Sequence, residues 1–523
     1  METDTKPHAA PWVVQLELEP PSLKDNTADG DRLCQALERT TGIRGMRIDY
    51  QLLQRLPDTL RQSQWRVRCI LADQPEGSRL LDVRPAADRR PVWGVAVDLG
   101  TTRVVLRLLD LDQLTAIGEL AFDNPQTAVA PDVLARIHHT DRSGGLDQLQ
   151  GLIVREINTR LGELCRIADG SPDNIWAMAL AGNTTMTHLF LGLPPGRIIR
   201  EPYIPVANRP PLLQASQLNL AIQAAAPVRI FPNVGSYFGG DLIAGILYSG
   251  LHTREETALL VDVGTNAEVI LGNRNWMIAC AGAAGPALEG GVSKIGMPAA
   301  PGVIERVRIH PDTRAFEFKT IDDQPPRGIC GSGVIELAAE LFKAGMLDIR
   351  GKLMPAECGP RFQTANGISH LRVVTAERSA TGRDLTLSQP DLDSLIRSKA
   401  AMYTILETLV ASVGLGLTDI DTFYVAGTFG SLIDPTAAIT IGMLPDLPLE
   451  RFQVLGNSSL EGASQALLQP RLIPAIHAIR DQTTYLELNV NQEFMNRFSA
   501  AKFLPHTDPD RFPSVRGNKY KVL

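Results

Sequence analysis

The sequence predicts an α/β protein with two related lobes that follow a small N-terminal α/β domain. The first indication is a motif that occurs twice, Asp98-Leu-Gly-Thr-Thr and Asp262-Val-Gly-Thr-Asn, each between two apolar runs. Aspartate, glycine and threonine fall at the same offsets, and the copies lie about one domain length apart. The second indication is that apolar strands from Gly94 onward repeatedly run into glycine-rich turns and then into strand or helix. This duplication predicts two lobes that face one another.

The chain of 523 residues is long enough for about three or four structural units. We expect a small α/β domain over residues 1–92, which ends in a polar, proline-terminated linker. The two lobes are expected over 93–250 and 251–500, and a C-terminal tail over 501–523. The elements predicted in the N-terminal domain are a strand at 13–18, a helix capped by Asp29 or Asp31, a short helix from about Tyr50 that stops before Pro57, and a strand at 65–71.

Composition excludes several classes of protein. Hydrophobic residues make up 44% of the chain and charged residues 21%, which sets aside disordered, collagen-like and coiled-coil proteins. The net charge is −7, so the chain lacks an overall positive field for nucleic acid. The N-terminus has no secretory pattern, and no stretch supplies about 20 unbroken apolar residues. We therefore expect a cytoplasmic protein with no nucleic-acid or membrane partner.

The spacing of cysteine and histidine argues against a metal cluster held by this chain. The six cysteines lie far apart without any Cys-x-x-Cys pair, and the nine histidines include no His-Glu-x-x-His. We interpret the cysteines as reduced thiols and expect no iron–sulfur cluster in this chain.

The two repeated turns contain residue types that suit phosphate and magnesium. Each places a carboxylate at a strand end, then a glycine that lets the backbone turn sharply, then hydroxyl or amide side chains beside exposed N–H groups. We expect Asp98 and Asp262 to hold Mg²⁺ directly or through its waters. An ordinary Asp-x-Gly hairpin is the simpler interpretation of one copy, but two matching copies favour a polyphosphate site. The candidate phosphate-binding residues are Gly100, Thr101 and Thr102 in the first turn and Gly264, Thr265 and Asn266 in the second.

A third turn follows an apolar strand and precedes a predicted helix. Asn183 or Thr184 can cap that helix, which by itself explains both residues. The functional alternative adds hydrogen bonds from these side chains to substrate or to the attacking water. His188 is more simply a packed or surface histidine than a general base.

Two later turns are candidates for contacts with a nucleotide. Gly331 and Ser332 open a predicted helix whose free N–H groups favour anions, although helix packing alone also explains the glycines. The second turn ends another apolar strand, and its glycines leave flat space for a base or ribose. Its candidate residues are Gly427, Thr428 and Gly430.

Two glutamates are candidates for orienting the attacking water. Glu289 lies in the small-residue loop Cys280–Gly291, where backbone can approach a ligand closely. Glu268 lies beside the second phosphate turn. A flexible hinge explains the glycines of that loop equally well.

The motifs Asp98-Leu-Gly-Thr-Thr, Asp262-Val-Gly-Thr-Asn and Val425-Ala-Gly-Thr-Phe-Gly together resemble the phosphate-1, phosphate-2 and adenosine motifs of the actin-like ATPase superfamily. That superfamily includes sugar and acetate kinases and heat-shock chaperones. Within it, longer strings look like the reductive activators of corrinoid proteins, and they cover nearly the whole chain. They are Pro20-Pro-Ser-Leu-Lys-Asp-Asn, Gly182-Asn-Thr-Thr-Met-Thr-His-Leu, Ala283-Ala-Gly-Pro-Ala-Leu-Glu-Gly-Gly, Gly328-Ile-Cys-Gly-Ser-Gly, Gly456-Asn-Ser-Ser-Leu-Glu-Gly-Ala and Phe503-Leu-Pro-His-Thr-Asp.

This resemblance implies duplicated actin-like (ribonuclease H-like) ATPase lobes that use ATP and Mg²⁺. Such activators help to return inactive cob(II)alamin to the cob(I)alamin state used by a corrinoid methyltransferase system, and the resemblance also implies a corrinoid protein partner and a homodimer. The family's electron carrier is an N-terminal ferredoxin-like domain with four clustered cysteines. This chain begins at what resembles the family's middle or linker domain, so we expect the electron donor on another domain or on a separate ferredoxin-like protein.

Our hypothesis is that ATP and magnesium bind between the two lobes and that closure changes the surface presented to the corrinoid partner. Hydrolysis then resets the cycle. Two alternatives stay open at this point. A small-molecule kinase of the same superfamily would transfer phosphate to a small acid or sugar, and a nucleotide-gated scaffold would bind ATP with negligible hydrolysis.

Overall fold

The computed structural model describes residues 10–74, 76–264, 267–282, 293–310, 312–427, 430–487 and 492–515. They form two compact units. The first unit comprises the chain up to Tyr248 together with Ser458–Asp481, and the second comprises Ser249–Asn457 and the chain from Gln482 onward. The segment Ser458–Asp481, which the sequence-based scheme groups with the second lobe, therefore belongs to the first unit. The domain boundaries inferred from sequence stay a proposal.

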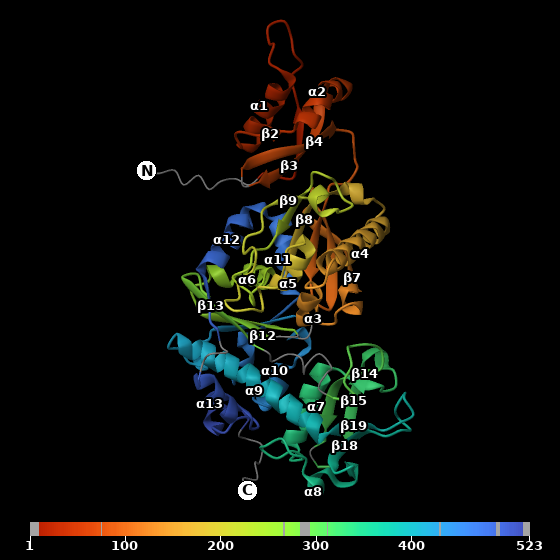
Figure 1. The fold of residues 1–523 in the computed structure, drawn as a ribbon, viewed down its shortest axis with the longest axis vertical. Coiled ribbons are helices and arrows are strands. Elements are labelled where there is room, and N and C mark those ends of the chain that lie inside the picture. Colours follow the sequence, from red (N-terminus) through yellow and green to blue (C-terminus); the bar gives the residue numbers. More distant parts are fainter. Residues whose placement is uncertain are drawn as a thin grey trace. The chain divides into compact units, whose positions relative to one another are not determined.

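The N-terminal domain of the first unit is a four-stranded sheet covered by two helices (Figure 1). Its helices have a face of leucines at helical spacing, of which Leu33 and Leu37 are fully buried against the sheet. The strands predicted at 13–18 and 65–71 are both confirmed. The elements are β1 (Val13–Glu17), α1 (Asp29–Thr41), β2 (Arg47–Ile48), α2 (Tyr50–Gln62), β3 (Arg66–Gln74) and β4 (Gly77–Pro85), and the strand order is β1-β3-β4-β2.

Two local predictions in this domain are wrong. Ala28 occupies the position before α1 and gives no side-chain cap, whereas Asp29 and Asp31 lie inside the first turn, where their charge still complements the helix dipole. Helix α2 does not stop before Pro57 but continues to Gln62. A leucine face that is buried both before and after the proline stabilises the continuous helix, and this outweighs the backbone hydrogen bond that a proline removes.

The two lobes repeat one sheet topology, which confirms the predicted duplication. In each lobe three antiparallel strands follow one another, and the first of them also pairs in parallel with a strand from much later in the chain. The first sheet has the order β7-β6-β5-β8-β10-β9 and the second β21-β20-β11-β12-β13-β22. The strands are β5 (Trp93–Leu99), β6 (Arg103–Asp110), β7 (Thr115–Asp123), β8 (Ile175–Gly182), β9 (Leu213–Gln214) and β10 (Pro227–Ile230), then β11 (Ala258–Val263), β12 (Ala267–Asn273), β13 (Trp276–Gly282), β20 (Thr422–Ala426), β21 (Phe452–Gly456) and β22 (Thr483–Tyr485).

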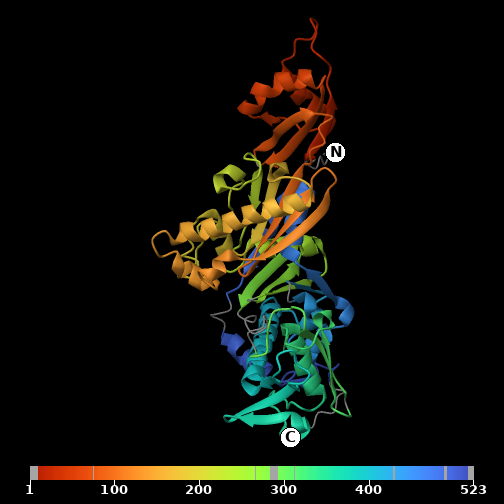
Figure 2. The same ribbon diagram turned by 90° about the vertical axis from the view of Figure 1, so that its right-hand side faces the viewer.

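Helices cover both faces of the first lobe's sheet. Val95 and Val97 of β5 lie in a core with α4 and α5, whereas Gly94 and Asp98, which alternate with them, face α11. Figure 2 shows the long orange helix α4 lying along its side of this sheet. The helices of this lobe are α3 (Val133–His139), α4 (Gly145–Ile167), α5 (Thr184–Leu191), α6 (Gly240–Ser249), α11 (Ser458–Leu468) and α12 (Ile473–Gln482).

The second unit adds two small sheets and several helices to its main sheet. Helix α9 packs against the antiparallel strands β12 and β13, and α13 packs against α9 (Figure 1). The added strands are β14 (Val303–Ile309), β15 (Phe316–Thr320) and β16 (Gly328–Ile329), then β17 (Phe362–Ala365), β18 (Ile368–Val374) and β19 (Leu385–Ser388). The helices are α7 (Gly331–Lys343), α8 (Pro355–Cys358), α9 (Gln389–Ser412), α10 (Pro435–Thr440) and α13 (Gln492–Ala501). In the part of the chain that is described, no helix has both the length and the apolar character required to cross a bilayer.

Two buried glutamates of α7 complete the hydrogen bonding of β14. Glu336 Oε2 accepts the backbone N–H of Val307 at 2.8 Å, and Glu340 Oε2 accepts that of Ile309 at 3.0 Å. Arg306 also donates to Glu336, at 2.6 Å, which balances its charge. Side chains of the helix thereby replace a neighbouring strand at these two amides.

Glu336→Ala should loosen β14 because it leaves the buried N–H of Val307 without an acceptor. An unpaired buried amide costs about 1–3 kcal/mol, so we expect hydrogen exchange at this amide to accelerate by about 10- to 100-fold. Exchange measured by mass spectrometry over Val303–Ile309 tests this. Glu317→Ala, on the exposed side of β15, is the matched control. Unchanged protection of β14 in Glu336→Ala would contradict the assignment.

Candidate functional site

Parallel strand pairing brings the first phosphate turn and the third turn together. Strand β5 pairs in parallel with β8, with Asp98 opposite Ala181 and Leu99 opposite Gly182. Both strands therefore end at the same edge of the sheet, as ligand-binding turns of α/β sheets do. Asn183, the residue after β8, donates from Nδ2 to Thr101 Oγ1 at 3.0 Å. The structure thus joins two candidate segments that are far apart in the sequence.

The hairpin turn after Asp98 is held in a single tight shape. A Cβ on Gly100 would lie 2.3 Å from the carbonyl oxygen of Arg103, so the turn accepts glycine alone. Asn124 secures the turn by donating from Nδ2 to the Gly100 carbonyl at 3.0 Å and from its backbone N–H to the Thr102 carbonyl at 2.8 Å. Thr101 is half-buried and Thr102 exposed, so both threonines remain at the surface of the lobe.

Asn183, rather than Thr184, caps α5. Its Oδ1 accepts the N–H of Met186 at 2.9 Å, while the buried Thr184 hydroxyl donates to the Gly235 carbonyl at 2.7 Å. His188 on the same helix is a packed histidine. Its Nδ1 lies 2.7 Å from the Thr184 carbonyl, and its Nε2 accepts the N–H of Val206 at 3.1 Å. Burial lowers the pKa of His188, so the ring is neutral and its nitrogens are occupied by the backbone.

Two contacts at the first turn were not among the predicted site residues. The Ser459 hydroxyl of α11 donates to Asp98 Oδ1 at 2.8 Å. The loop before α6 also approaches the turn, because a Cβ on Gly239 would lie 2.5 Å from Asn183 Cα and 2.6 Å from Asp241 Oδ1. The pair of glycines before Asp241 was a usable signal for close backbone approach. Ser459 lay in a string that carried the family resemblance, but its sequence separation of 361 residues from Asp98 gives no local signal.

The second turn repeats the arrangement around Asp262. This residue pairs with Glu268 on β12 and with Ala426 on the parallel strand β20. Directly opposed residues of antiparallel strands project from the same face, so the Asp262 and Glu268 carboxylates share one side of the sheet. Gly427 directly follows β20 and has a left-handed backbone conformation. It lies beside the Asp262 carboxylate, because a Cβ on Gly427 would be 2.6 Å from Asp262 Oδ1. The structure thus brings Asp262, Glu268 and Gly427 together.

Of the remaining candidate nucleotide-binding and water-orienting residues in the turns around Asp262 and Gly427 and in the loop Cys280–Gly291, the structure describes two. Gly264 follows β11 directly, and Gly430 starts a short 3₁₀ turn that leads to α10, which Asp434 caps. Thr265, Asn266, Glu289 and Thr428 lie outside the described residues. Their assigned roles stay predictions.

The glycine turn at Gly331 opens a helix as predicted. Gly331 is the first residue of α7, and Ser332, which is buried, has its hydroxyl 3.1 Å from Cys330 Sγ. A Cβ on Gly333 would lie 2.6 Å from the Ile304 carbonyl, so this glycine lets the helix pack closely on β14. Packing explains that glycine, and an anion-binding role for Gly331 and Ser332 stays a prediction.

The cysteines of the described chain are free thiols in apolar surroundings. Five are buried and Cys34 is half-buried. Burial raises the pKa of Cys69 to about 12 and that of Cys165 to about 11, which disfavours the thiolate form that metals bind. Within the ranges that the structure describes, no three His, Cys, Asp or Glu side chains are grouped to hold a metal ion.

Comparison with known proteins gives consistent matches along the chain. Residues 2–90 match the RACo linker region, residues 93–254 the RACo middle region, and residues 256–516 the C-terminal domain of RACo, described as the ASKHA domain. The structure is similar to that of a reductive activator for corrinoid, iron-sulfur protein, with a TM-score of 0.87 and 38% identity over 97% of this chain and 81% of that chain. These matches confirm the predicted α/β fold with an actin-like ATPase domain.

Two curated proteins are also similar in sequence. The corrinoid activation enzyme RamQ of Eubacterium limosum is 29% identical over 431 residues, which are 81% of this chain and 72% of RamQ. The Co(II) methylated amine-specific corrinoid protein reductase of Methanosarcina barkeri is 22% identical over 442 residues, 77% of this chain and 76% of that reductase.

Gly427→Ala should destabilise the second unit through a steric clash with Asp262. The left-handed conformation costs alanine about 1–2 kcal/mol, and the clash with the carboxylate and with Val263 adds about 1–3 kcal/mol. Gly414→Ala is the matched control, because Gly414 is also left-handed but has open space around its Cβ position. Chemical unfolding should show a clearly larger loss for Gly427→Ala. Equal losses in the two variants would mean that Asp262 does not restrict this position.

Proposed function

Because this chain belongs to the family of reductive activators of corrinoid proteins, we propose that it couples ATP binding and hydrolysis to the restoration of cob(I)alamin in a corrinoid protein. The observation that carries the proposal is the duplicated sheet, which presents an aspartate-bearing hairpin turn in each unit. In each unit a second turn, at Asn183 or at Gly427, lies against it. The family and the similar proteins support corrinoid activation as the process.

The residues present suit ATP and Mg²⁺. Asp98 and Asp262 supply carboxylate oxygens, which are the ligands that Mg²⁺ prefers, and Thr101 adds a hydroxyl beside the first. At the second turn, the absence of a side chain on Gly427 leaves open the space beside Asp262 that a Cβ would occupy. Bound Mg-ATP would supply the free energy of phosphate release.

We assign the following roles within this proposal. Asp98 and Asp262 hold the metal, and Glu268 and Glu289 orient the attacking water. Main-chain and hydroxyl groups of both turns hold the phosphates. The nucleotide contacts are assigned to Gly100, Thr101, Thr102, Asn183, Thr184, Gly264, Thr265, Asn266, Gly331, Ser332, Gly427, Thr428 and Gly430.

The proposal places the electron donor outside the described residues of this chain, on another domain or on a ferredoxin-like protein. Burial raises the pKa of the Cys69 and Cys165 thiols, which supports this because a protonated thiol is a poor ligand for a redox cluster. The proposed partner is the corrinoid protein of a methyltransferase system. We also propose that the activator works as a homodimer, as the family resemblance implies.

Asp98→Ala and Asp262→Ala should each lower magnesium-dependent ATP hydrolysis by about 100-fold or more, because each removes an oxygen ligand at the developing phosphate charge. Phosphate release at saturating ATP measures this. Asp147→Ala, at an exposed position of α4, is the matched control and should hydrolyse ATP normally. Normal turnover in both site variants would refute the assignment.

ATP should change the affinity of the chain for its corrinoid partner and promote formation of cob(I)alamin. We would mix the chain with a cob(II)alamin-bearing corrinoid protein and a low-potential reductant, then follow cob(I)alamin by absorbance with and without ATP. A pulldown with the same two proteins measures the effect of ATP on binding. Asp98→Ala should lose the ATP dependence. Stoichiometric transfer of phosphate to a small acceptor would instead indicate a kinase, and ATP-sensitive binding without hydrolysis a scaffold.

A further inference from the structure

Helix α11 contacts both the Asp98 turn and the N-terminal domain. At its start the Ser459 hydroxyl, only 5% exposed, donates to Asp98 Oδ1 at 2.8 Å. At its end the Leu467 carbonyl accepts the indole N–H of Trp12 at 2.6 Å. Trp12 belongs to the N-terminal sheet, because its carbonyl accepts the N–H of Leu71 on β3. A single helix therefore connects the predicted nucleotide turn to a separate domain.

Strand β5 and helix α11 run alongside each other from Asp98 to Gly94. Gly94 of β5 faces Leu467, since a Cβ on Gly94 would lie 3.2 Å from Leu467 Cδ1, and Asp98 faces Ser459. The eight residues from Ser459 to Leu467 span about 12 Å of helix, and the four from Gly94 to Asp98 about 13 Å of strand. The two ends of α11 are thus aligned with the two ends of the strand that carries Asp98.

Side contacts link α11 to β6 and to α6. Arg107 of β6 donates to Glu461 Oε1 at 2.6 Å and to Ser464 Oγ at 3.2 Å. On another side, a Cβ on Gly462 would lie 2.1 Å from the carbonyl oxygen of Ala244, so the backbones of α11 and α6 touch. Because the backbone hydrogen bonds of the helix keep its length constant, a displacement along its axis at Ser459 also moves Leu467.

The contact with Trp12 satisfies a group that the helix itself leaves unpaired. The last four carbonyls of a helix have no partner within it, and Leu467 is one of these. Trp12 and Leu467 are 7% and 3% exposed, so bulk solvent has little access to this contact. Loss of this bond leaves a buried carbonyl unpaired, which makes the contact sensitive to small movements of either side.

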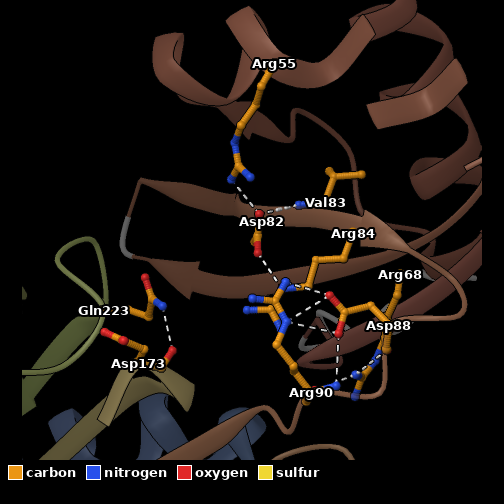
Figure 3. Close-up of polar contacts among 9 residues, drawn as sticks. All are labelled: Arg55, Arg68, Asp82, Val83, Arg84, Asp88, Arg90, Asp173 and Gln223. Atoms are coloured by element: carbon orange, nitrogen blue, oxygen red, sulfur yellow. Dashed lines mark hydrogen bonds and ion pairs between the residues drawn. The ribbon is translucent and has the colours of Figure 1, made fainter. Parts of the chain in front are cut away.

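Other contacts keep the N-terminal domain on the lobe independently of Trp12. Arg68 of β3 forms an ion pair with Asp112 at 2.8 Å, and the Arg84 guanidinium lies 4.9 Å from the Trp176 ring centre. Figure 3 shows Arg68 and Arg84 within a cluster of arginines and aspartates, in which Asp82 accepts from Arg84 at 2.7 Å. These contacts should keep the domain on the lobe when the Trp12 bond is removed.

We propose that Ser459 is a positioning residue for Asp98 and that α11 couples the nucleotide turn to the N-terminal domain. This inference rests on the proposed function, because it takes the Asp98 turn to bind ATP. A nucleotide that changes the interactions of Asp98 changes the free energy of the Ser459 contact and so the position of α11. Coupling between two sites is reciprocal, so removal of the Trp12 bond changes nucleotide affinity.

A double-mutant cycle on ATP affinity tests the coupling. Calorimetric titration with Mg-ATP would compare the unaltered chain with Trp12→Phe, Ser459→Ala and the double variant. Trp12→Phe keeps an aromatic ring but removes the N–H donor and part of the ring volume, and the control Trp65→Phe makes the same reduction in ring size. We expect each single change to weaken binding by about 5-fold and the double variant to be no weaker than about 5- to 10-fold. Trp65→Phe, which alters an indole of the same domain that has no bond to α11, should stay within about 2-fold.

A spectroscopic measurement adds a readout that a purely structural role would not change. Mg-ATP should alter tryptophan emission of the unaltered chain, and the Trp12 part of this change, absent in Trp12→Phe, should also be lost in Ser459→Ala. Should Ser459→Ala fold poorly, Trp12→Phe alone still decides whether the distant indole affects ATP affinity.

Three results overturn the proposal in distinguishable ways. ATP affinity unchanged in Trp12→Phe, or single effects that multiply to about 25-fold in the double variant, would show that α11 does not couple the two sites while leaving the proposed function intact. Failure of the unaltered chain to bind ATP would contradict the proposed function and this inference with it.

Discussion

The site depends above all on the parallel pairing of an aspartate-bearing strand with a strand from much later in the chain. In the first unit β5 pairs with β8, and in the second β11 pairs with β20. Since parallel strands end at the same sheet edge, each pairing sets a carboxylate beside the turn that leaves the partner strand. The Asn183 bond to Thr101 and the approach of Gly427 to Asp262 both follow from this geometry.

Glycines then bring backbone segments closer together than side chains would allow. At Gly100 the hairpin closes on its own carbonyl, at Gly239 the loop before α6 meets Asn183, and at Gly462 helix α11 meets α6. Each approach would place a Cβ within 2.5 Å of another atom, so any larger residue must displace the backbone. The shape of the first turn therefore depends on these glycines as much as on the polar groups of Asp98 and Asn183. Such close packing favours one conformation of the turn, as a preorganised site requires.

Local pattern was enough to predict the repeated hairpins, a helix cap at Asn183 or Thr184, of which the structure selects Asn183, and the helix that opens at Gly331. Turn chemistry and strand alternation are encoded within a few residues. Predictions failed where distant packing decides. Pro57 lies inside a helix because buried leucines continue on both sides of it. Two contacts connect residues that no short sequence pattern relates: Ser459 with Asp98, and Glu336 of α7 with the N–H of Val307 on β14. The fold had to be known before either contact could be found.

Our proposal gives the described residues of this chain a positioning role and places the electron donor elsewhere. Carboxylates and hydroxyls gather at strand ends, whereas five of the six cysteines are buried. A protein of this kind can promote an uphill electron transfer only if nucleotide binding changes the free energy of a second contact, since a ligand shifts a conformational equilibrium only by its differential affinity for the two states. Helix α11 supplies such a contact in one unit, because hydrogen bonds at its two ends connect it to Asp98 and to the N-terminal domain. In our proposal, the free energy of nucleotide binding at the Asp98 turn therefore reaches the N-terminal domain through this helix.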